Sequence, residues 1–186
     1  MSINLSYRRL PQSELQQVLD GVPAAYKKWF GPLDLMADDV DDEFERMHEW
    51  LDASGQGLSI TNAWQAIHFL LTGEFCFQGA SQTPPPLSNV VMGGTPTDIE
   101  TTYGVAYYLT PEEVAEVARV LEPLLLETLA SRYDAARFRE ARVYPGYDNW
   151  GDDGLARYGI GTDYENLRAF FLLAARENQA MFLALD

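Results

Sequence analysis

The clearest structural signal in this 186-residue chain is the stretch Asn62-Ala63-Trp64-Gln65-Ala66-Ile67-His68-Phe69-Leu70-Leu71-Thr72-Gly73. Its apolar residues recur at helical spacing, which predicts a helix over residues 62–71. Thr61 or Asn62 can cap the first free N–H groups of that helix, and Gly73 can adopt the left-handed conformation that ends it. Trp64 and His68 are four residues apart, so they share one face of the predicted helix.

Three stretches predict strands, and they lie far apart in the chain. Residues 3–8 place Ile3, Leu5 and Tyr7 on one strand face, residues 103–109 are rich in Tyr and Val, and residues 180–185 again alternate. Residues 148–161 are polar and rich in glycine, which predicts an exposed loop. Further helices are predicted over residues 13–19, 23–30, 38–53, 111–125 (interrupted at Pro123), 134–141 and 164–178.

The order of these elements indicates the fold class. The strands do not alternate regularly with helices, so a doubly wound parallel sheet is not indicated. We expect one compact α+β domain over residues 1–186, with a small mixed or antiparallel sheet of about three to four strands packed by about six helices.

The composition limits the classes of partner. Hydrophobic residues make up 47% of the chain and aromatic residues 12%, which is enough for a core without disulfides or metals. The chain has 28 Asp and Glu against 13 Lys and Arg, a net charge of −15. Such a protein repels nucleic-acid phosphates and anionic membranes, so neither is an expected partner. The charge fits either simple solubility or the binding of a basic partner.

The cysteine count and the N-terminus both fit a cytoplasmic location. Cys76 is the only cysteine, so no intrachain disulfide can form, and this suits a reducing compartment. Residues 1–9 have no apolar segment after their positive charges, so we expect no signal peptide. No apolar run approaches the roughly 18 residues that a membrane span needs.

Motifs for metals, cofactors and nucleophilic catalysis are absent from the sequence. The two histidines, His48 and His68, lie on different predicted helices, and no zinc-ligand spacing occurs. Gly93-Gly94 is not followed by Gly-Lys-Ser/Thr, so there is no phosphate-binding loop. A Gly-x-Ser-x-Gly nucleophile elbow is also missing. We therefore predict no metal, no cofactor and no catalytic residues.

His68 is the one residue that suggests a small-molecule site. A histidine on an apolar helix face is most often a hydrogen-bonded core residue. The alternative is a binding residue or general base at the mouth of a pocket. The candidate ligand-binding residues are Trp64, His68, Tyr108 and Tyr144.

Two acidic segments suggest a surface for a protein partner. Carboxylates at the start of the helix over residues 38–53 are stabilised by the helix dipole, but capping explains only one or two of them. The others form either a solvated face or a docking surface. The loop after Tyr144 mixes aromatic residues with aspartates, and these aromatics are either core residues or interface anchors. The candidate partner-binding residues are Asp38, Asp39, Asp41, Asp42, Tyr147, Asp148, Trp150, Asp152 and Asp153.

Several motifs occur in an order that resembles a known family. They are Trp64-x-x-x-His68-Phe69-Leu70-Leu71-Thr72-Gly73, Pro86-Leu87 before Gly93-Gly94, Tyr103-Gly104, Tyr108-Leu109-Thr110-Pro111-Glu112-Glu113-Val114 and Tyr144-Pro145-Gly146. Together they resemble the YfbM-like family of bacterial proteins of unknown function, over nearly the whole chain. The resemblance implies a single cytosolic α+β domain and carries over no catalytic residues. The family usually has a Trp soon after Tyr-Pro-Gly, whereas Tyr147-Asp148-Asn149 precede Trp150 here.

Two functions from different classes remain after these exclusions. The first is a non-catalytic acidic protein that binds a protein partner, in its sharpest form an immunity-type inhibitor of a basic toxin. The alternative is an enzyme or small-molecule-binding domain with a pocket around His68, Trp64 and Tyr108.

Overall fold

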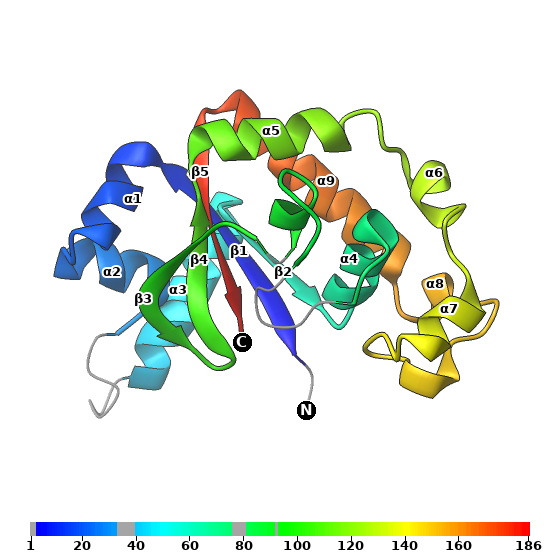
Figure 1. Cartoon of the computed structure of the whole chain (residues 1–186). Helices are drawn as coiled ribbons and strands as arrows, with labels where there is room; N and C mark the ends of the chain where they lie inside the picture. Colours follow the sequence, from blue (N-terminus) through cyan, green and yellow to red (C-terminus); the bar gives the residue numbers. More distant parts are fainter. Residues whose placement is uncertain (1–2, 33–39, 76–80, 92) are drawn as a thin grey trace.

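The computed structural model describes residues 3–32, 40–75, 81–91 and 93–186. Within these residues the chain forms nine α-helices and one open antiparallel sheet of five strands, with helices on both faces of the sheet (Figure 1). The α+β class predicted from the sequence is confirmed. No helix in these parts of the chain combines the length and apolarity needed to cross a bilayer.

The sheet joins the two ends of the chain at its centre. Its strand order is β2-β1-β5-β4-β3, and every neighbouring pair is antiparallel. Leu5 pairs with Leu185 and Tyr7 with Leu183, so the start of β1 lies beside the end of β5 (Figure 1). The strands are β1 (Asn4–Pro11), β2 (Gly57–Thr61), β3 (Thr95–Thr101), β4 (Gly104–Leu109) and β5 (Gln179–Leu185).

The prediction of about three to four strands missed β2 and β3, which are both edge strands. The sequence of β3 contains Pro96 and Asp98, which disfavour a central strand but are tolerated at an edge. Its side chains are exposed or half-buried, so no apolar alternation marks it. β2 has five residues and begins with Gly57, which is too short for a clear pattern.

Most helices lie where the sequence predicts them. α2 has the predicted bounds, and Pro123 separates α5 from α6. Thr110 begins α5 with a capping box, in which Glu113 N donates to Thr110 Oγ1 (3.3 Å) and Thr110 N donates to Glu113 Oε2 (2.8 Å). The helices are α1 (Gln12–Leu19), α2 (Pro23–Phe30), α3 (Val40–Ser54), α4 (Trp64–Thr72), α5 (Pro111–Leu121), α6 (Leu126–Ala130), α7 (Ala135–Glu140), α8 (Gly154–Arg157) and α9 (Ile160–Arg176).

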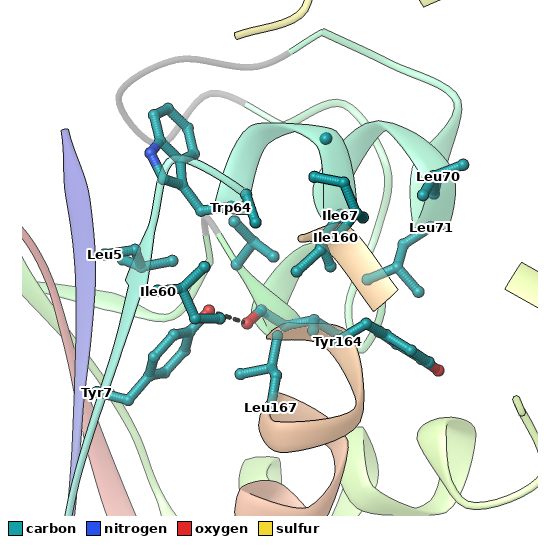
Figure 2. Packing of buried hydrophobic residues seen from close by; sticks show 14 of the residues in the cluster. Leu5, Tyr7, Ile60, Trp64, Ile67, Leu70, Leu71, Ile160, Tyr164 and Leu167 are labelled. Carbon is teal, nitrogen blue, oxygen red and sulfur yellow. Dashed lines mark hydrogen bonds between the residues drawn. The ribbon is translucent and has the colours of Figure 1, made fainter. Parts of the chain in front are cut away.

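The larger core lies between the sheet and the layer that contains α4, α5 and α9 (Figure 1). Leu5 and Tyr7 of β1 and Ile60 of β2 point from the sheet toward Ile67 of α4 and Leu167 of α9 (Figure 2). The Tyr7 hydroxyl, buried here, donates to the Val90 carbonyl oxygen at 2.8 Å. This packing explains why alternate residues of β1 are apolar.

A smaller core lies on the opposite face, under α1, α2 and α3 (Figure 1). It joins Leu10 of β1 and Phe182 of β5 to buried side chains such as Trp29 of α2 and Met47 of α3. These contacts occupy only one end of the face. At the other end β1 presents polar residues, and a cavity forms there.

Candidate functional site

A cavity of about 660 Å³ lies between the polar end of the sheet and helices α2 and α3. Ligand sites in proteins typically have volumes of roughly 300–1,000 Å³. The sheet side of the cavity comes from β1, β2, β5 and the end of β3, and the helices supply the opposite wall.

Strand alternation produces the polar side of this cavity. Side chains of a strand point to alternate faces, so Asn4, Ser6 and Arg8 lie on the face opposite to the larger core. In the neighbouring strands Ser59 and Ala184 pair with Ser6 and also line the cavity. On the face toward α2 and α3, this end of the sheet therefore carries polar or small side chains. Close packing of helices on a sheet normally requires apolar side chains at such positions.

Arg8 is the unusual member of this row because it is buried and has no hydrogen-bond or ion-pair partner among the described residues. Only 6% of the residue is exposed, and Nε is fully buried without a hydrogen bond. Within the described residues no hydrogen bond or ion pair reaches its side chain, whose guanidinium stacks on the Phe30 ring at 4.8 Å. Burial lowers the pKa of Arg8, while electrostatic interactions with Asp186 and Tyr26 act in the opposite direction. An unpaired buried cation is costly, since a desolvated charge normally requires a partner.

The neighbouring Arg9 is also a buried arginine, but its side chain is engaged in structural hydrogen bonds. Arg9 is also 6% exposed. Its Nε donates to the Gly55 carbonyl oxygen (2.9 Å), and its Nη1 donates to Gln179 Oε1 (2.7 Å) and pairs with the Glu177 carboxylate. Arg8 and Arg9 are equally buried, but only Arg9 has hydrogen-bond partners among the described residues. The guanidinium of Arg8 is therefore available to bind a group outside those residues.

Two further unpaired polar atoms line the same cavity. Asn4 Oδ1 and Thr101 Oγ1 are buried and have no hydrogen-bond partner. With Arg8 Nε they make up three of the five such side-chain atoms among the described residues. Native proteins leave few buried polar groups unpaired, so their concentration in one cavity indicates a site for a bound molecule or ordered water.

The remaining lining is partly apolar and partly acidic. Phe30 of α2 and Phe44, Met47 and Leu51 of α3 form the apolar part. Among the described lining residues, His48, Asp52, Glu100, Asp186 and Tyr26 also have ionisable side chains. Among the described residues no group of three or more His, Cys, Asp or Glu side chains is placed to hold a metal ion.

Two of the predicted ligand-binding residues, Trp64 and Tyr144, lie together in the core. Their ring centroids are 6.0 Å apart, and both residues are buried. Trp64 Nε1 donates to the Ile3 carbonyl oxygen (3.0 Å), and Ile3 N donates to the Tyr144 hydroxyl (3.0 Å). Their polar atoms thus hold the backbone just before β1.

The other two predicted ligand-binding residues do not join a common pocket with them. Tyr108 of β4 packs against the smaller core, on the opposite face of the sheet from Trp64. His68 has an exposed fraction of 0%, and neither ring nitrogen is hydrogen-bonded. Glu74 Oε1 lies 3.7 Å from His68 Nε2. Burial lowers the pKa of His68 and the Glu74 carboxylate partly opposes this, so the imidazole is neutral at pH 7.

The predicted partner-binding residues are mostly exposed where the structure describes them. Asp41 and Asp42 are exposed in the first turn of α3, whereas Asp38 and Asp39 lie outside the described residues. Tyr147 is 44% exposed. Asp148, Asp152 and Asp153 are exposed as well.

The prediction that residues 148–161 form an exposed loop is wrong at Trp150, which is only 1% exposed. Its indole N–H donates to the Val143 carbonyl oxygen (2.7 Å), and its ring packs against Phe138 (4.8 Å) and Tyr158 (4.7 Å). Polar and glycine residues suggested a loop, but a 3₁₀ turn and α8 wrap these residues around the indole. Trp150 therefore belongs to the core and cannot anchor a partner.

Family comparisons agree with the fold. Residues 1–184 match the family described as "Domain of unknown function (DUF1877)". The chain belongs to this family. The DUF1877 chain is also similar to the crystal structure of a protein of unknown function, YfbM from Escherichia coli, with 22% sequence identity, a TM-score of 0.63 and 100% of each chain covered. At that identity the likeness shows a shared fold. No curated protein matches the chain. The predicted YfbM-like family is thus confirmed, and the cavity around Arg8 was not predicted.

Proposed function

We propose that this protein binds a small molecule in the cavity between α2, α3 and the sheet, with Arg8 as the principal binding group. The observation that supports this most strongly is a buried guanidinium without a hydrogen bond or ion pair among the described residues. The predicted alternative placed a ligand around His68, Trp64 and Tyr108. The Arg8 cavity is the better candidate because its unpaired atoms face a space large enough for a ligand.

The burial of Arg8 without a partner among the described residues carries an energetic cost. A buried charge without a partner destabilises the folded protein by an effective penalty of several kcal/mol, so it is retained where it has a role. A bound group that accepts hydrogen bonds from Arg8 would remove this penalty. Charge-assisted hydrogen bonds in a partly desolvated site are also stronger than neutral ones, which favours binding there.

A thermal-shift screen of a metabolite library tests this proposal. A ligand at 100 times its Kd stabilises the folded state by about 2.7 kcal/mol, which raises Tm by roughly 5–10 °C in a protein of this size. We expect such a shift for the wild type and none for Arg8→Met. Arg119→Met, a change on the exposed surface of α5, should respond as the wild type does. Compounds that stabilise Arg8→Met as strongly as the wild type would refute the site.

A second candidate function, the binding of a protein partner, is supported by a different observation. Tyr147 is exposed, and Asp148, Asp152 and Asp153, which follow it closely in the sequence, are exposed as well, in a chain of net charge −15. Tyrosine is enriched among interface anchors, and acidic surfaces speed the capture of basic proteins. The sharpest form of this proposal is an immunity-type inhibitor of a basic toxin in the cytoplasm.

Affinity capture from the native cell, washed at low and then high salt, tests the second candidate. A basic protein that is retained at low salt and lost with the combined change Tyr147→Ser, Asp148→Asn and Asp153→Asn would support it. The matched control is Glu112→Gln with Glu116→Gln, two carboxylates on exposed positions of α5. A captured protein that is retained equally at low and high salt, and equally by the wild type and the combined variant, would contradict an acidic docking surface.

A further inference from the structure

The groups around Arg8 indicate the chemical class of the ligand, an inference that rests on the proposed function. We infer that the ligand is an uncharged molecule with a lactam edge, in which a ring carries a carbonyl group and an N–H group side by side. The carbonyl oxygen accepts a hydrogen bond from Arg8, and the N–H group donates one to the Asp186 carboxylate.

Arg8 provides a buried hydrogen-bond donor. Its guanidinium stacks on the Phe30 ring, 4.8 Å from the ring centroid. The N–H groups of a guanidinium lie in its plane, so a ring stacked on one face does not occupy them. Nε is buried and has no hydrogen-bond partner. The ligand must therefore present a hydrogen-bond acceptor to Arg8.

The Asp186 carboxylate lies beside Arg8 on the same face of the sheet. Ser6 and Arg8 are two residues apart in β1, so their side chains share one face about 7 Å apart along the strand, and both line the cavity. Ser6 Oγ donates to Asp186 Oδ2 at 2.7 Å, which holds the carboxylate next to Ser6. Asp186 also acts electrostatically on Arg8, because burial lowers the pKa of Arg8 and the Asp186 charge partly opposes this.

Arg8 and Asp186 are neighbours that do not bond to each other. Among the described residues the Arg8 side chain forms no hydrogen bond and no ion pair, with Asp186 or with any other group. A carboxylate has about four lone-pair positions, so the single bond from Ser6 leaves others open. Asp186 is exposed, which keeps its carboxylate accessible. A small molecule placed between the two groups can therefore bond to both.

The opposite charges of these two neighbours favour an uncharged ligand. An anion at Arg8 would meet the adjacent Asp186 carboxylate, and Asp52 and Glu100 add two further carboxylates to the lining. A cation at Asp186 would meet the Arg8 guanidinium, which is buried and therefore little screened. A neutral ligand gains a charge-assisted hydrogen bond at each group and meets neither repulsion.

A lactam has the geometry that this pair of neighbours requires. In an ordinary trans amide the C=O and N–H groups point in opposite directions, so they cannot face adjacent partners. A small ring holds its amide in the cis form, which puts the acceptor and the donor on one edge. The cavity, at about 660 Å³, has room for such a ring and for substituents on it. Asn4 Oδ1 and Thr101 Oγ1, unpaired in the same cavity, can bond to polar substituents.

Saturation-transfer NMR titrations with three matched rings test this inference on the wild type. Uracil is uncharged at pH 7 and has the lactam edge. Its dimethyl derivative, 1,3-dimethyluracil, keeps both carbonyl groups and loses both N–H groups. Orotate keeps the edge and adds a carboxylate to the ring. We expect uracil to bind with a Kd of about 1 mM, as suits a ligand of so few atoms, and the other two rings to bind about 10-fold more weakly or less.

Protein variants then test the two contacts separately. Arg8→Met should abolish the binding of uracil. Asp186→Asn keeps an oxygen that can accept from Ser6 but removes the negative charge, so it should weaken uracil and bind orotate more tightly than the wild type does. A merely structural role of Asp186 would not raise the affinity for orotate. Arg119→Met should leave all three affinities unchanged, and circular dichroism melts confirm that the variants fold.

The outcomes separate the ligand class from the proposed function. If orotate or 1,3-dimethyluracil binds the wild type as tightly as uracil, and Arg8→Met removes that binding, the uncharged lactam is wrong and the Arg8 site stands. If uracil does not bind the wild type at about 10 mM, or binds Arg8→Met equally well, the inference is wrong and the thermal-shift screen alone decides the proposed function. If neither these rings nor any compound of the metabolite library binds the wild type, both are wrong.

Discussion

Replacing Arg8 with Met should stabilise the protein, because it removes an unpaired buried charge and keeps a side chain of similar length. The effective cost of a buried unpaired ion is several kcal/mol. Against this gain stand the stacking of the guanidinium on Phe30, worth about 0.5–2 kcal/mol, and its attraction to the Asp186 carboxylate. We therefore expect a net gain of about 1–3 kcal/mol, which corresponds to a Tm higher by roughly 2–12 °C.

Urea denaturation monitored by circular dichroism measures this gain as a shift in midpoint at constant slope. Arg9→Met is the matched control, since Arg9 is adjacent and equally buried but forms three side-chain hydrogen bonds. Its loss leaves Gln179 and the Gly55 carbonyl without a partner. We expect Arg9→Met to destabilise the protein by about 1–3 kcal/mol, discounted for the half-exposed Glu177. If both variants destabilise the protein to the same degree, Arg8 has a partner in the free protein and the reasoning fails.

Three further predictions concern other parts of the molecule. Burial lowers the pKa of His68, so the unfolded state binds more protons and stability falls as pH drops below about 6.5. His68→Leu should remove part of this loss between pH 7.5 and 5.5, and an unchanged pH slope in urea titrations would contradict this. Thr110→Ala removes the capping box of α5 and should lower stability by about 1 kcal/mol, checked by thermal melting. In urea denaturation, Trp150→Ala should lower the free energy of unfolding by about 3–5 kcal/mol and Tyr147→Ala by less than about 1 kcal/mol. A larger loss for Tyr147→Ala than for Trp150→Ala would mean that Tyr147, and not Trp150, is the buried ring.

The sequence predicted those parts of the fold whose signals are local. The alternation of Ile3, Leu5 and Tyr7 indicates a strand, and the Thr110-Pro111-Glu112-Glu113 motif indicates a helix start, because each pattern reflects short-range backbone chemistry. Edge strand β3 escaped prediction because its side chains face solvent and its proline is tolerated only at an edge. Trp150 was predicted to lie in an exposed loop because its neighbours in the sequence are polar. Its ring is buried by tertiary contacts with Phe138 and Tyr158, which the sequence does not reveal.

The cavity could not be predicted because it depends on how two distant segments pack. Asn4, Ser6 and Arg8 appear in the sequence as the polar face of a strand, which ordinarily faces water. The position of α2 and α3 converts that face into a largely buried one and leaves only 6% of Arg8 exposed. Some of the residues predicted to bind a partner, Tyr147 among them, are exposed, and their exposure could be predicted from their polar surroundings in the sequence.

Arginine side-chain NMR gives the most direct test that the Arg8 cavity binds a ligand. In a ¹⁵N-labelled sample the Arg8 Nε–H signal can be assigned by its loss in Arg8→Met, and the Arg9 Nε–H signal provides an internal reference. During titration with the tightest-binding compound from the thermal-shift library, we expect the Arg8 signal to move progressively while the Arg9 signal stays in place. A saturating ligand that leaves the Arg8 signal unchanged, or shifts only the Trp64 indole signal, would contradict the account.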